Sequence, residues 1–236
     1  MPRIVVCGEA LIDIVPAGNG TLVALPGGGP FTTARALGRL GVPAAYLGRL
    51  SDDGFGEILA RTLREDGTDL SLVSRGPELT TLAVAELDRA GVAAYRFYVE
   101  GTSAPHLTPA MLPAALPAAV SALHIGTLGL VLEPMATTIE GLTMRESGKR
   151  LVMLDLNVRT ALVHDAGVYH RRLESLMAAS TVVKASDADL AWLFPDLDPE
   201  PAAERILDCG AGMAVVTLGA RGAFGARRGL SVSVRA

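Results

Sequence analysis

Residues 151–184, LVMLDLNVRTALVHDAGVYHRRLESLMAASTVVK, contain the pattern that decides the fold. Leu151 to Leu154 is a short apolar run and predicts a buried strand. Tyr169 to Ala178 has helical periodicity, and Thr181 to Lys184 is a second short run that predicts a strand. A strand, a helix and a strand in this order form the unit of a parallel sheet, in which the helix connects two parallel strands.

The same alternation continues on both sides of this segment. Further buried strands are predicted at Ile4 to Cys7, Ala44 to Leu50, Ala122 to Ile125 and Ala214 to Leu218. Helices are predicted at Thr32 to Leu40, Gly56 to Glu65, Pro134 to Ser147 and Pro201 to Cys209, with Gly41, Gly67 and Gly210 at positions typical of helix C-caps. The sequence therefore predicts an α/β fold with a doubly wound, mainly parallel sheet and helices on both faces.

Two segments lack this alternation. Residues Ile14 to Pro26 and Thr81 to Tyr98 alternate as strands do, and no helical pattern lies beside them. Turn signals lie within each segment, at Gly18-Asn19-Gly20 and at Asp88-Arg89-Ala90-Gly91. We expect one α/β domain over residues 1–236, in which segments of about 14–26 and 81–98 form a small separate sheet, a lid.

The composition excludes several classes of protein. Half of the 236 residues are hydrophobic and the formal net charge is −4, with no basic stripe, so a nucleic-acid partner is not expected. The amino-terminal apolar stretch contains Glu9 and Asp13, and no apolar run reaches the roughly 18 residues of a membrane span. Cys7 and Cys209 are too few for a disulfide framework. We expect a cytoplasmic protein without a membrane partner.

Polar residues follow four of the predicted strands. Ligands of open α/β sheets bind outside the carboxyl ends of the strands, so these positions are candidates for the site. They are Glu9 and Asp13 after the first strand, Asp155, Asn157 and Arg159 after Leu154, Lys184, Ser186, Asp187 and Asp189 after Val183, and Thr217, Gly219 and Gly222 after Val216. Any one set could be a helix cap, as Ser186 or Asp187 would be for the helix that carries Trp192. Four such sets together favour one ligand site.

A glycine-rich turn precedes the helix at Thr32. In Pro26-Gly27-Gly28-Gly29-Pro30 the consecutive glycines let the backbone approach a ligand closely, next to a helix N-terminus. The turn lacks the Gly-Lys-Ser/Thr of a Walker A loop. Taken alone, it could equally be a simple connection between a strand and a helix.

Taken in order, these segments resemble the ribokinase-like (pfkB-type) carbohydrate kinases, and among them the fructokinases. The resemblance rests on these segments in order: Gly8-Glu9 with Asp13, GGGPFTTARALGRLG from Gly27 to Gly41, GRLSDDGFG from Gly48 to Gly56, Gly101 to Leu107 followed by Thr108-Pro109, His124-Ile125-Gly126, DLNVR from Asp155 to Arg159, VVKASDADLAWL and VVTLGARGAF. It covers nearly the whole chain. It implies ATP-dependent phosphorylation of a sugar hydroxyl with Mg²⁺, and a homodimer formed through the lid. The Asp-x-Asn-x-Arg element and the His124 segment favour fructose or a related keto-sugar, while 2-keto-3-deoxygluconate, ribose and a nucleoside stay open.

The resemblance also implies a role for each matching residue. Sugar-binding positions would be Asp13, Gly27, Gly28, Gly29 and Thr32. Arg159 would stabilise the transferred phosphate, where a planar guanidinium suits phosphate oxygens. Nucleotide-binding positions would be Asn157, Lys184, Ser186, Thr217, Gly219 and Gly222, with Asp189 on the metal.

The chain departs from the family pattern at three places. Thr32 replaces a sugar-binding Asn, and Ser186 with Asp189 replaces an Asn-x-x-Glu element. The family's Gly-Ala-Gly-Asp motif, whose Asp is the catalytic base, has no match in these 236 residues. A general base contributes about 10²–10⁴ in rate, so we expect this chain, as printed, to turn over weakly or not at all. The alternative is a non-catalytic sugar- or nucleotide-binding homologue. We also expect one sheet face to expose apolar surface.

Overall fold

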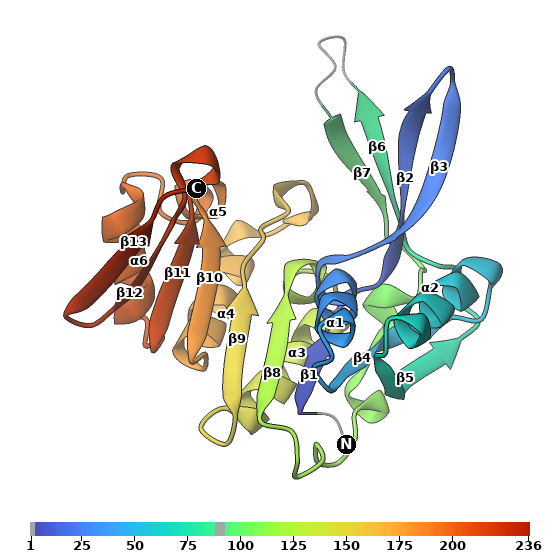
Figure 1. Cartoon of the computed structure of the whole chain (residues 1–236), viewed down its shortest axis with the longest axis horizontal. Helices are drawn as coiled ribbons and strands as arrows, with labels where there is room; N and C mark the ends of the chain where they lie inside the picture. Colours follow the sequence, from blue (N-terminus) through green and yellow to red (C-terminus); the bar gives the residue numbers. More distant parts are fainter. Residues whose placement is uncertain (1–2, 88–92) are drawn as a thin grey trace.

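The structure is a computed structural model that describes residues 3–87 and 93–236. Its main sheet has the strand order β13-β12-β11-β10-β9-β8-β1-β4-β5 (Figure 1). All neighbouring strands from β11 to β5 are parallel, while β12 and β13 pair antiparallel at one edge. The strands are β1 (Ile4–Cys7), β4 (Ala44–Ser51), β5 (Asp69–Gly76), β8 (Ala122–Gly126), β9 (Leu151–Asp155), β10 (Val182–Ser186), β11 (Met213–Thr217), β12 (Ala223–Arg227) and β13 (Leu230–Val234).

Helices cover both faces of this sheet, so the doubly wound fold predicted from the sequence is confirmed. Val6 and Tyr46 pack with Phe31 of α1 and Leu59 of α2 on one face. On the other face, alternate strand residues such as Leu154 pack into the large core beneath the remaining helices. The helices are α1 (Gly29–Arg39), α2 (Gly54–Glu65), α3 (Met135–Glu146), α4 (Ala166–Ala178), α5 (Asp187–Leu193) and α6 (Pro199–Asp208).

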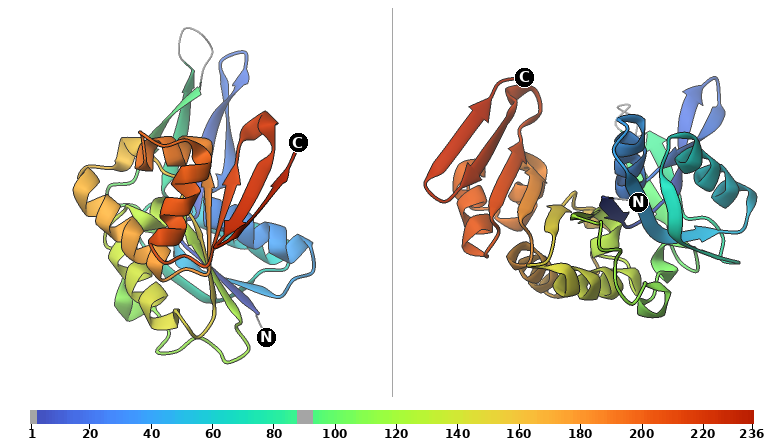
Figure 2. Two further views of the ribbon diagram at one scale, coloured as in Figure 1. Left: turned by 90° about the vertical axis from the view of Figure 1, so that its left-hand side faces the viewer. Right: turned by 60° about the horizontal axis from the view of Figure 1, so that its bottom comes forward.

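The face that carries α1 and α2 is only partly covered. Both helices lie over β1, β4 and β5, and Figure 2 shows no helix of the described chain over the same face of β9 to β13. Apolar side chains there are exposed, with Leu151 45% and Met213 39% accessible. The expected exposure of apolar surface on one sheet face is thus observed.

A second sheet stands apart from the main one. It has the order β3-β2-β6-β7 and is formed by β2 (Leu11–Gly18), β3 (Thr21–Gly27), β6 (Leu82–Leu87) and β7 (Ala93–Tyr98) (Figure 1). These are the two segments predicted to form the lid. The first turn is at Asn19-Gly20, whose φ angles of 52° and 74° are those of a tight hairpin turn. The turn predicted at residues 88–91 lies outside the described residues.

Several element boundaries differ from the sequence prediction by one to three residues, and not every strand was predicted. Helix α1 begins at Gly29, three residues before the predicted Thr32, because Pro30 has a φ that suits the first helical turn. Strand β5 was not predicted, although Leu70 and Leu72 alternate there with polar residues. The predicted C-cap glycines are confirmed, since Gly41, Gly67 and Gly210 all have positive φ just after a helix. Within the described ranges no helix is both long and apolar enough to cross a membrane.

Candidate active site

The carboxyl ends of the parallel strands meet at one edge of the main sheet. Asp155 at the end of β9 pairs in register with Lys184 on β10, and Ser186 at the end of β10 pairs with Thr217 on β11. Strand β1, which leads to Glu9 and Asp13, lies beyond β8 in the same sheet. The polar residues predicted at four strand ends are therefore neighbours along a single edge.

A cavity of about 200 Å³ opens at this edge, between the main sheet and the lid. Asp13 and Arg159, far apart in the sequence, both line it. The complete lining is Glu9, Leu11, Asp13, Gly28, Gly29, Tyr95, Phe97, Thr127, Leu128 and Arg159. Four of the residues predicted for the site thus surround one space.

Asp13 reaches the cavity from the lid strand β2. Its neighbours in register are Leu25 on β3 and Ala83 on β6. Partial burial raises the pKa of its carboxyl, and the positive charge of Arg159 acts in the opposite direction. A half-buried carboxylate beside a cation is a good acceptor for hydroxyl groups, because little water competes for its oxygens.

The glycine turn fits tightly against this acid. A Cβ on Gly27 would lie 1.9 Å from Oδ2 of Asp13, and one on Gly28 would lie 2.7 Å from the carbonyl oxygen of Glu9. Gly28 is the N-cap of α1 and has a φ of 106°, where side chains are strained. The glycines are therefore required here, and the turn that looked like a weak signal in the sequence forms one wall of the cavity.

Arg159 is the cation of the cavity. Its Nη1 makes only long contacts with the carbonyl oxygens of Asn157 and Val158, at 3.5 and 3.3 Å. Among the residues that the structure describes, no carboxylate lies within ion-pair distance of it. This guanidinium faces a polar cavity and has N–H donors left for a ligand. It therefore suits an anionic group such as a phosphate.

The other predicted nucleotide residues extend along the edge away from Asp13. The Lys184 ammonium lies 3.1 Å from Oδ1 of Asp155, and the Thr217 hydroxyl donates to the Ala185 carbonyl oxygen at 3.5 Å. Gly219 has a positive φ, and no atom would meet a Cβ there. At Gly222 a Cβ would lie 2.0 Å from the Val234 carbonyl oxygen, so this glycine allows β13 to approach. Contact of these residues with a nucleotide stays a prediction.

Asn157 links the loop that carries Arg159 to the turn that carries Thr127. It has a φ of 37°, uncommon for a residue with a side chain, and its Nδ2 donates to Oγ1 of Thr127 at 3.1 Å. Thr127, at the start of the 3-10 helix η3 (Thr127–Leu130), has a φ of 56°. Strained backbone of this kind persists only where its surroundings hold it, which is common at functional sites.

Ser186 and Asp189 form a capping box at the start of α5. Oδ2 of Asp189 accepts hydrogen bonds from the Ser186 N–H and hydroxyl, both at 2.7 Å, and Oδ1 accepts one from the Val158 N–H at 2.7 Å. Both oxygens are thus engaged, so Asp189 fixes the loop before Arg159. Its predicted contact with a metal stays a prediction, as does sugar binding by Thr32, which is exposed on α1 and does not line the cavity.

Six residues of the cavity lining were given no role from the sequence: Glu9, Leu11, Tyr95, Phe97, Thr127 and Leu128. Glu9 was noticed at a strand end but given no role, and nothing in the sequence marks Thr127. Tyr95 and Phe97 lie two apart on β7, so they share one lid face, and their rings are 6.3 Å apart. In the sequence, Tyr95 and Phe97 alternate with the polar Arg96, and this strand pattern could have predicted that both aromatic rings lie on one face of the lid, over the cavity.

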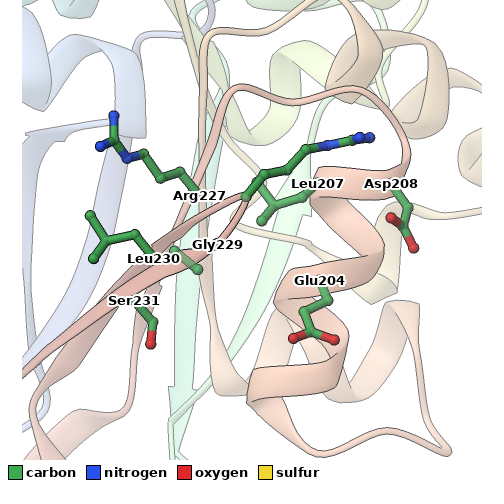
Figure 3. Close-up of a pocket in the computed structure, with 9 residues that line it drawn as sticks. Glu204, Leu207, Asp208, Arg227, Gly229, Leu230 and Ser231 are labelled. Atoms are coloured by element: carbon green, nitrogen blue, oxygen red, sulfur yellow. The ribbon is translucent and has the colours of Figure 1, made fainter.

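A larger space of about 500 Å³ lies elsewhere, between the end of α6 and the β12–β13 turn (Figure 3). Glu204, Asp208 and Arg227 are among its lining residues. Arg227 pairs with Leu230 next to the start of β11, so this space lies at the opposite edge of the sheet from Thr217. None of the residues predicted for the site lines it.

Comparison with known proteins decides the family. The family model described as pfkB family carbohydrate kinase matches residues 1–236. The chain belongs to the pfkB family of carbohydrate kinases. It is 39% identical over 235 residues to the fructokinase of Rhizobium leguminosarum bv. trifolii, covering 98% of this chain and 72% of that relative. It is 31% identical over 200 residues to fructokinase-2 of Solanum lycopersicum, covering 80% of this chain and 61% of that relative.

Solved structures agree with this assignment. The pfkB-family chain matches fructokinase from Vibrio cholerae O395 in a form bound to fructose, ADP and calcium ion, with a TM-score of 0.88 and 25% identity, over all of this chain and 76% of that one. It also matches the fold of fructokinase from Xylella fastidiosa with bound ATP, with a TM-score of 0.90 and 23% identity, over all of this chain and 74% of that one. A sugar kinase, a phosphotransferase with an alcohol acceptor, is the class of enzyme that these comparisons give, and they favour it over the non-catalytic alternative.

Proposed function

We propose that the protein is a fructokinase, which transfers the γ-phosphoryl group of ATP to a hydroxyl of D-fructose. The observation that carries the proposal is the cavity in which Asp13 and Arg159 face a common space beneath the lid. A hydroxyl acceptor needs a carboxylate to hold it, and a phosphoryl donor needs a cation. Both are present in one cavity, and the relatives named above with the highest identity are fructokinases.

The sugar is proposed to lie between Asp13 and the glycine turn. The half-buried carboxylate of Asp13 would accept hydrogen bonds from sugar hydroxyls, and Gly27 to Gly29 leave room for the ring because they carry no side chains. Tyr95 and Phe97 would cover the sugar from the lid. Such a cover excludes water, which competes with the sugar for the phosphoryl group.

The phosphate chain of ATP is proposed to run along the strand edge from Arg159. The guanidinium of Arg159 would stabilise the negative charge of the transferred group, since its donors match phosphate oxygens. The ends of β9, β10 and β11 would hold the rest of the nucleotide, through Asn157, Lys184, Ser186, Thr217, Gly219 and Gly222.

Mg²⁺ is the metal expected with ATP, and the residues present fit it. Mg²⁺ keeps several waters and binds through one or two carboxylates together with substrate phosphates, so it needs no dedicated cage. Residues 3–87 and 93–236 contain no group of three His, Cys, Asp or Glu side chains that could hold a metal ion. Asp189, whose oxygens already accept backbone hydrogen bonds, would contact waters of the ion. When bound, the ion neutralises charge on the phosphates.

We further propose a homodimer formed through the lid and a cytoplasmic location. Val23, Leu25 and Tyr95 lie on the lid face that carries Asp13, with 39%, 46% and 48% of their surface exposed. Contiguous apolar surface of this kind is typical of an interface. Both cysteines are free, which agrees with a reducing compartment where ATP is available.

The experiment measures sugar binding and ADP release together. Isothermal calorimetry with a non-hydrolysable ATP analogue present should detect D-fructose, with weaker binding of ribose, 2-keto-3-deoxygluconate and nucleosides. In Asp13→Ala, fructose affinity should fall about 10- to 100-fold or more, because each hydrogen bond to a charged group contributes about 1.5–3 kcal/mol. Affinity for the ATP analogue should stay unchanged.

Asp196→Ala is the matched control, since Asp196 is an exposed carboxylate remote from the cavity lining. It should bind fructose as the wild type does. A coupled assay of ADP release then tests whether fructose stimulates turnover. Wild-type protein that binds another of these sugars more tightly than fructose would contradict the substrate, and unchanged fructose affinity in Asp13→Ala would contradict the site.

A further inference from the structure

We propose that Glu9 is a positioning residue of the sugar site, whose carboxylate joins the glycine turn before α1 to the turn that carries Thr127. This inference rests on the proposed function, because it assigns the residue that holds the walls of that cavity in place. Gly8-Glu9 is part of the family resemblance, which gives a role only to Asp13, and the comparisons give Glu9 none. Its position between two chain segments carries the argument.

Each oxygen of the Glu9 carboxylate binds a different turn. Oε1 accepts a hydrogen bond from the Gly29 N–H at 2.9 Å, and Oε2 accepts one from the Gly129 N–H at 3.3 Å. Gly29 begins α1, and Gly129 lies in η3. One side chain on the β1–β2 connection therefore links two elements that are 100 residues apart in the sequence and lie on either side of the cavity.

The bond to Gly29 replaces a missing helix cap. The first N–H groups of a helix have no partner within the helix, and Gly28, the N-cap of α1, has no side chain to supply one. A carboxylate at this end is also favoured by the helix dipole. Glu9 thus fixes where α1 starts, and with it the course of the glycine turn beside Asp13.

The bond to Gly129 supports the strained turn next to it. Thr127 is a β-branched residue with a φ of 56°, and its Oγ1 would lie 2.4 Å from a Cβ on Gly29. The two turns therefore touch, and each is held by one oxygen of Glu9. Asn157 holds Thr127 from the other side, through the Nδ2 hydrogen bond already described.

Glu9 is fully buried, although burying a carboxyl group costs free energy. Its side chain has no exposed surface, and burial raises the pKa of its carboxyl to about 8, although the backbone N–H groups and the charge of Arg159 act to lower it. Burying an apolar side chain at this position would cost less free energy than burying a carboxyl group. Because both oxygens accept backbone hydrogen bonds, neither is directed at a substrate hydroxyl, so positioning explains the geometry better than proton transfer.

Two substitutions test the proposal by calorimetry with fructose and the ATP analogue. Glu9→Gln keeps one acceptor but sets an amide donor against a backbone N–H, and Glu9→Met keeps the bulk while removing both hydrogen bonds and the buried acid. At about pH 9, above the raised pKa of Glu9 so that its carboxyl is ionised, each should weaken fructose binding about 10- to 100-fold, the equivalent of one charge-assisted hydrogen bond. Affinity for the ATP analogue should change less than about twofold, which distinguishes positioning of the sugar walls from a general loss of structure.

Glu146→Gln is the matched control. Glu146 is also a buried carboxylate, 3% exposed, and it binds Arg145 and Arg150 at the end of α3, away from the cavity. It should lower thermal stability and leave fructose affinity unchanged. Folding of at least Glu9→Met is expected, because removing a buried acid relieves its desolvation.

The outcomes separate this inference from the proposed function. Wild-type protein that binds no sugar contradicts the proposed function. Wild-type binding of fructose, together with unchanged affinity in folded Glu9→Met, overturns only the role of Glu9. Glu9→Gln that binds fructose normally but loses fructose-dependent ADP release also overturns it, because that result makes Glu9 a proton acceptor.

Discussion

The buried acid Glu9 should make the free energy of unfolding depend on pH in a way that a neutral side chain does not. In the unfolded chain its carboxyl has an ordinary pKa of 4.5, and in the folded protein burial raises the pKa to about 8. The folded protein therefore binds a proton at Glu9 more tightly than the unfolded chain does. Its stabilising contribution is complete below pH 4.5 and is lost as the pH rises toward 8.

The size of the effect follows from the gap between the two pKa values. Each pH unit well within this gap corresponds to about 1.4 kcal/mol, so the rise from about pH 5.5 to about pH 7.5 should lower the unfolding free energy by roughly 2–3 kcal/mol. Burial also raises the pKa values of the neighbouring Cys7 thiol and Tyr46 hydroxyl. Both groups stay protonated in this range in either state, so they do not contribute.

Urea denaturation of wild type and Glu9→Met at three pH values in this range measures the effect. The titration of all other groups is shared, so the difference in unfolding free energy between the two proteins isolates Glu9. That difference should move by roughly 2–3 kcal/mol in favour of Glu9→Met as the pH rises. Parallel pH profiles for the two proteins would refute the reasoning, because they would mean that the carboxyl titrates normally despite its burial.

Two further predictions concern the glycine turn and the lid. In Gly27→Ala the new Cβ would meet Oδ2 of Asp13 at 1.9 Å, so calorimetry should show fructose affinity reduced at least about tenfold. Gly54→Ala is the control, because a Cβ there meets nothing within 4 Å, and it should bind fructose as the wild type does. Equal affinities in the two variants would contradict the close fit between Gly27 and Asp13. Sedimentation velocity should show a dimer for the wild type. Val23→Asp puts a charge on the exposed lid face and should shift the protein toward monomer. A wild-type monomer at micromolar concentration would exclude the lid interface.

The sequence predicts the parts of the fold that depend on local pattern. Short apolar runs such as Ile4 to Cys7 predict buried strands because central parallel strands are covered on both faces, and β1 has the predicted bounds. The polar residues after these runs meet at one edge because parallel strands end on the same side. Pattern fails for β5, an edge strand in which Ser71, Ser74 and Arg75 interrupt the apolar run.

Roles that depend on packing between distant segments could not be predicted. The hydrogen bonds of Glu9 join residues 20 and 120 positions further along the chain, and no local pattern records them. Asp189 stays a predicted metal contact by its place in a motif, and the structure adds that its carboxylate caps α5 and binds the Val158 N–H, which the motif does not indicate. Sugar binding by Thr32 stays a prediction, and the pattern did not indicate that α1 starts at Gly29 and that Thr32 is exposed on this helix.

Asp13 belongs to the lid, while Glu9, only four residues earlier, lies on the connection that follows β1 of the main sheet. The carboxylate proposed to hold the sugar therefore travels with the lid whenever the two sheets change their angle. Thermodynamic reciprocity then connects two properties that are usually measured separately. If a contact between two lids favours one lid orientation, it changes sugar affinity by some factor, and bound sugar must change the affinity of that contact by the same factor. The dimerisation constant of a lid-mediated dimer should therefore depend on the concentration of the sugar.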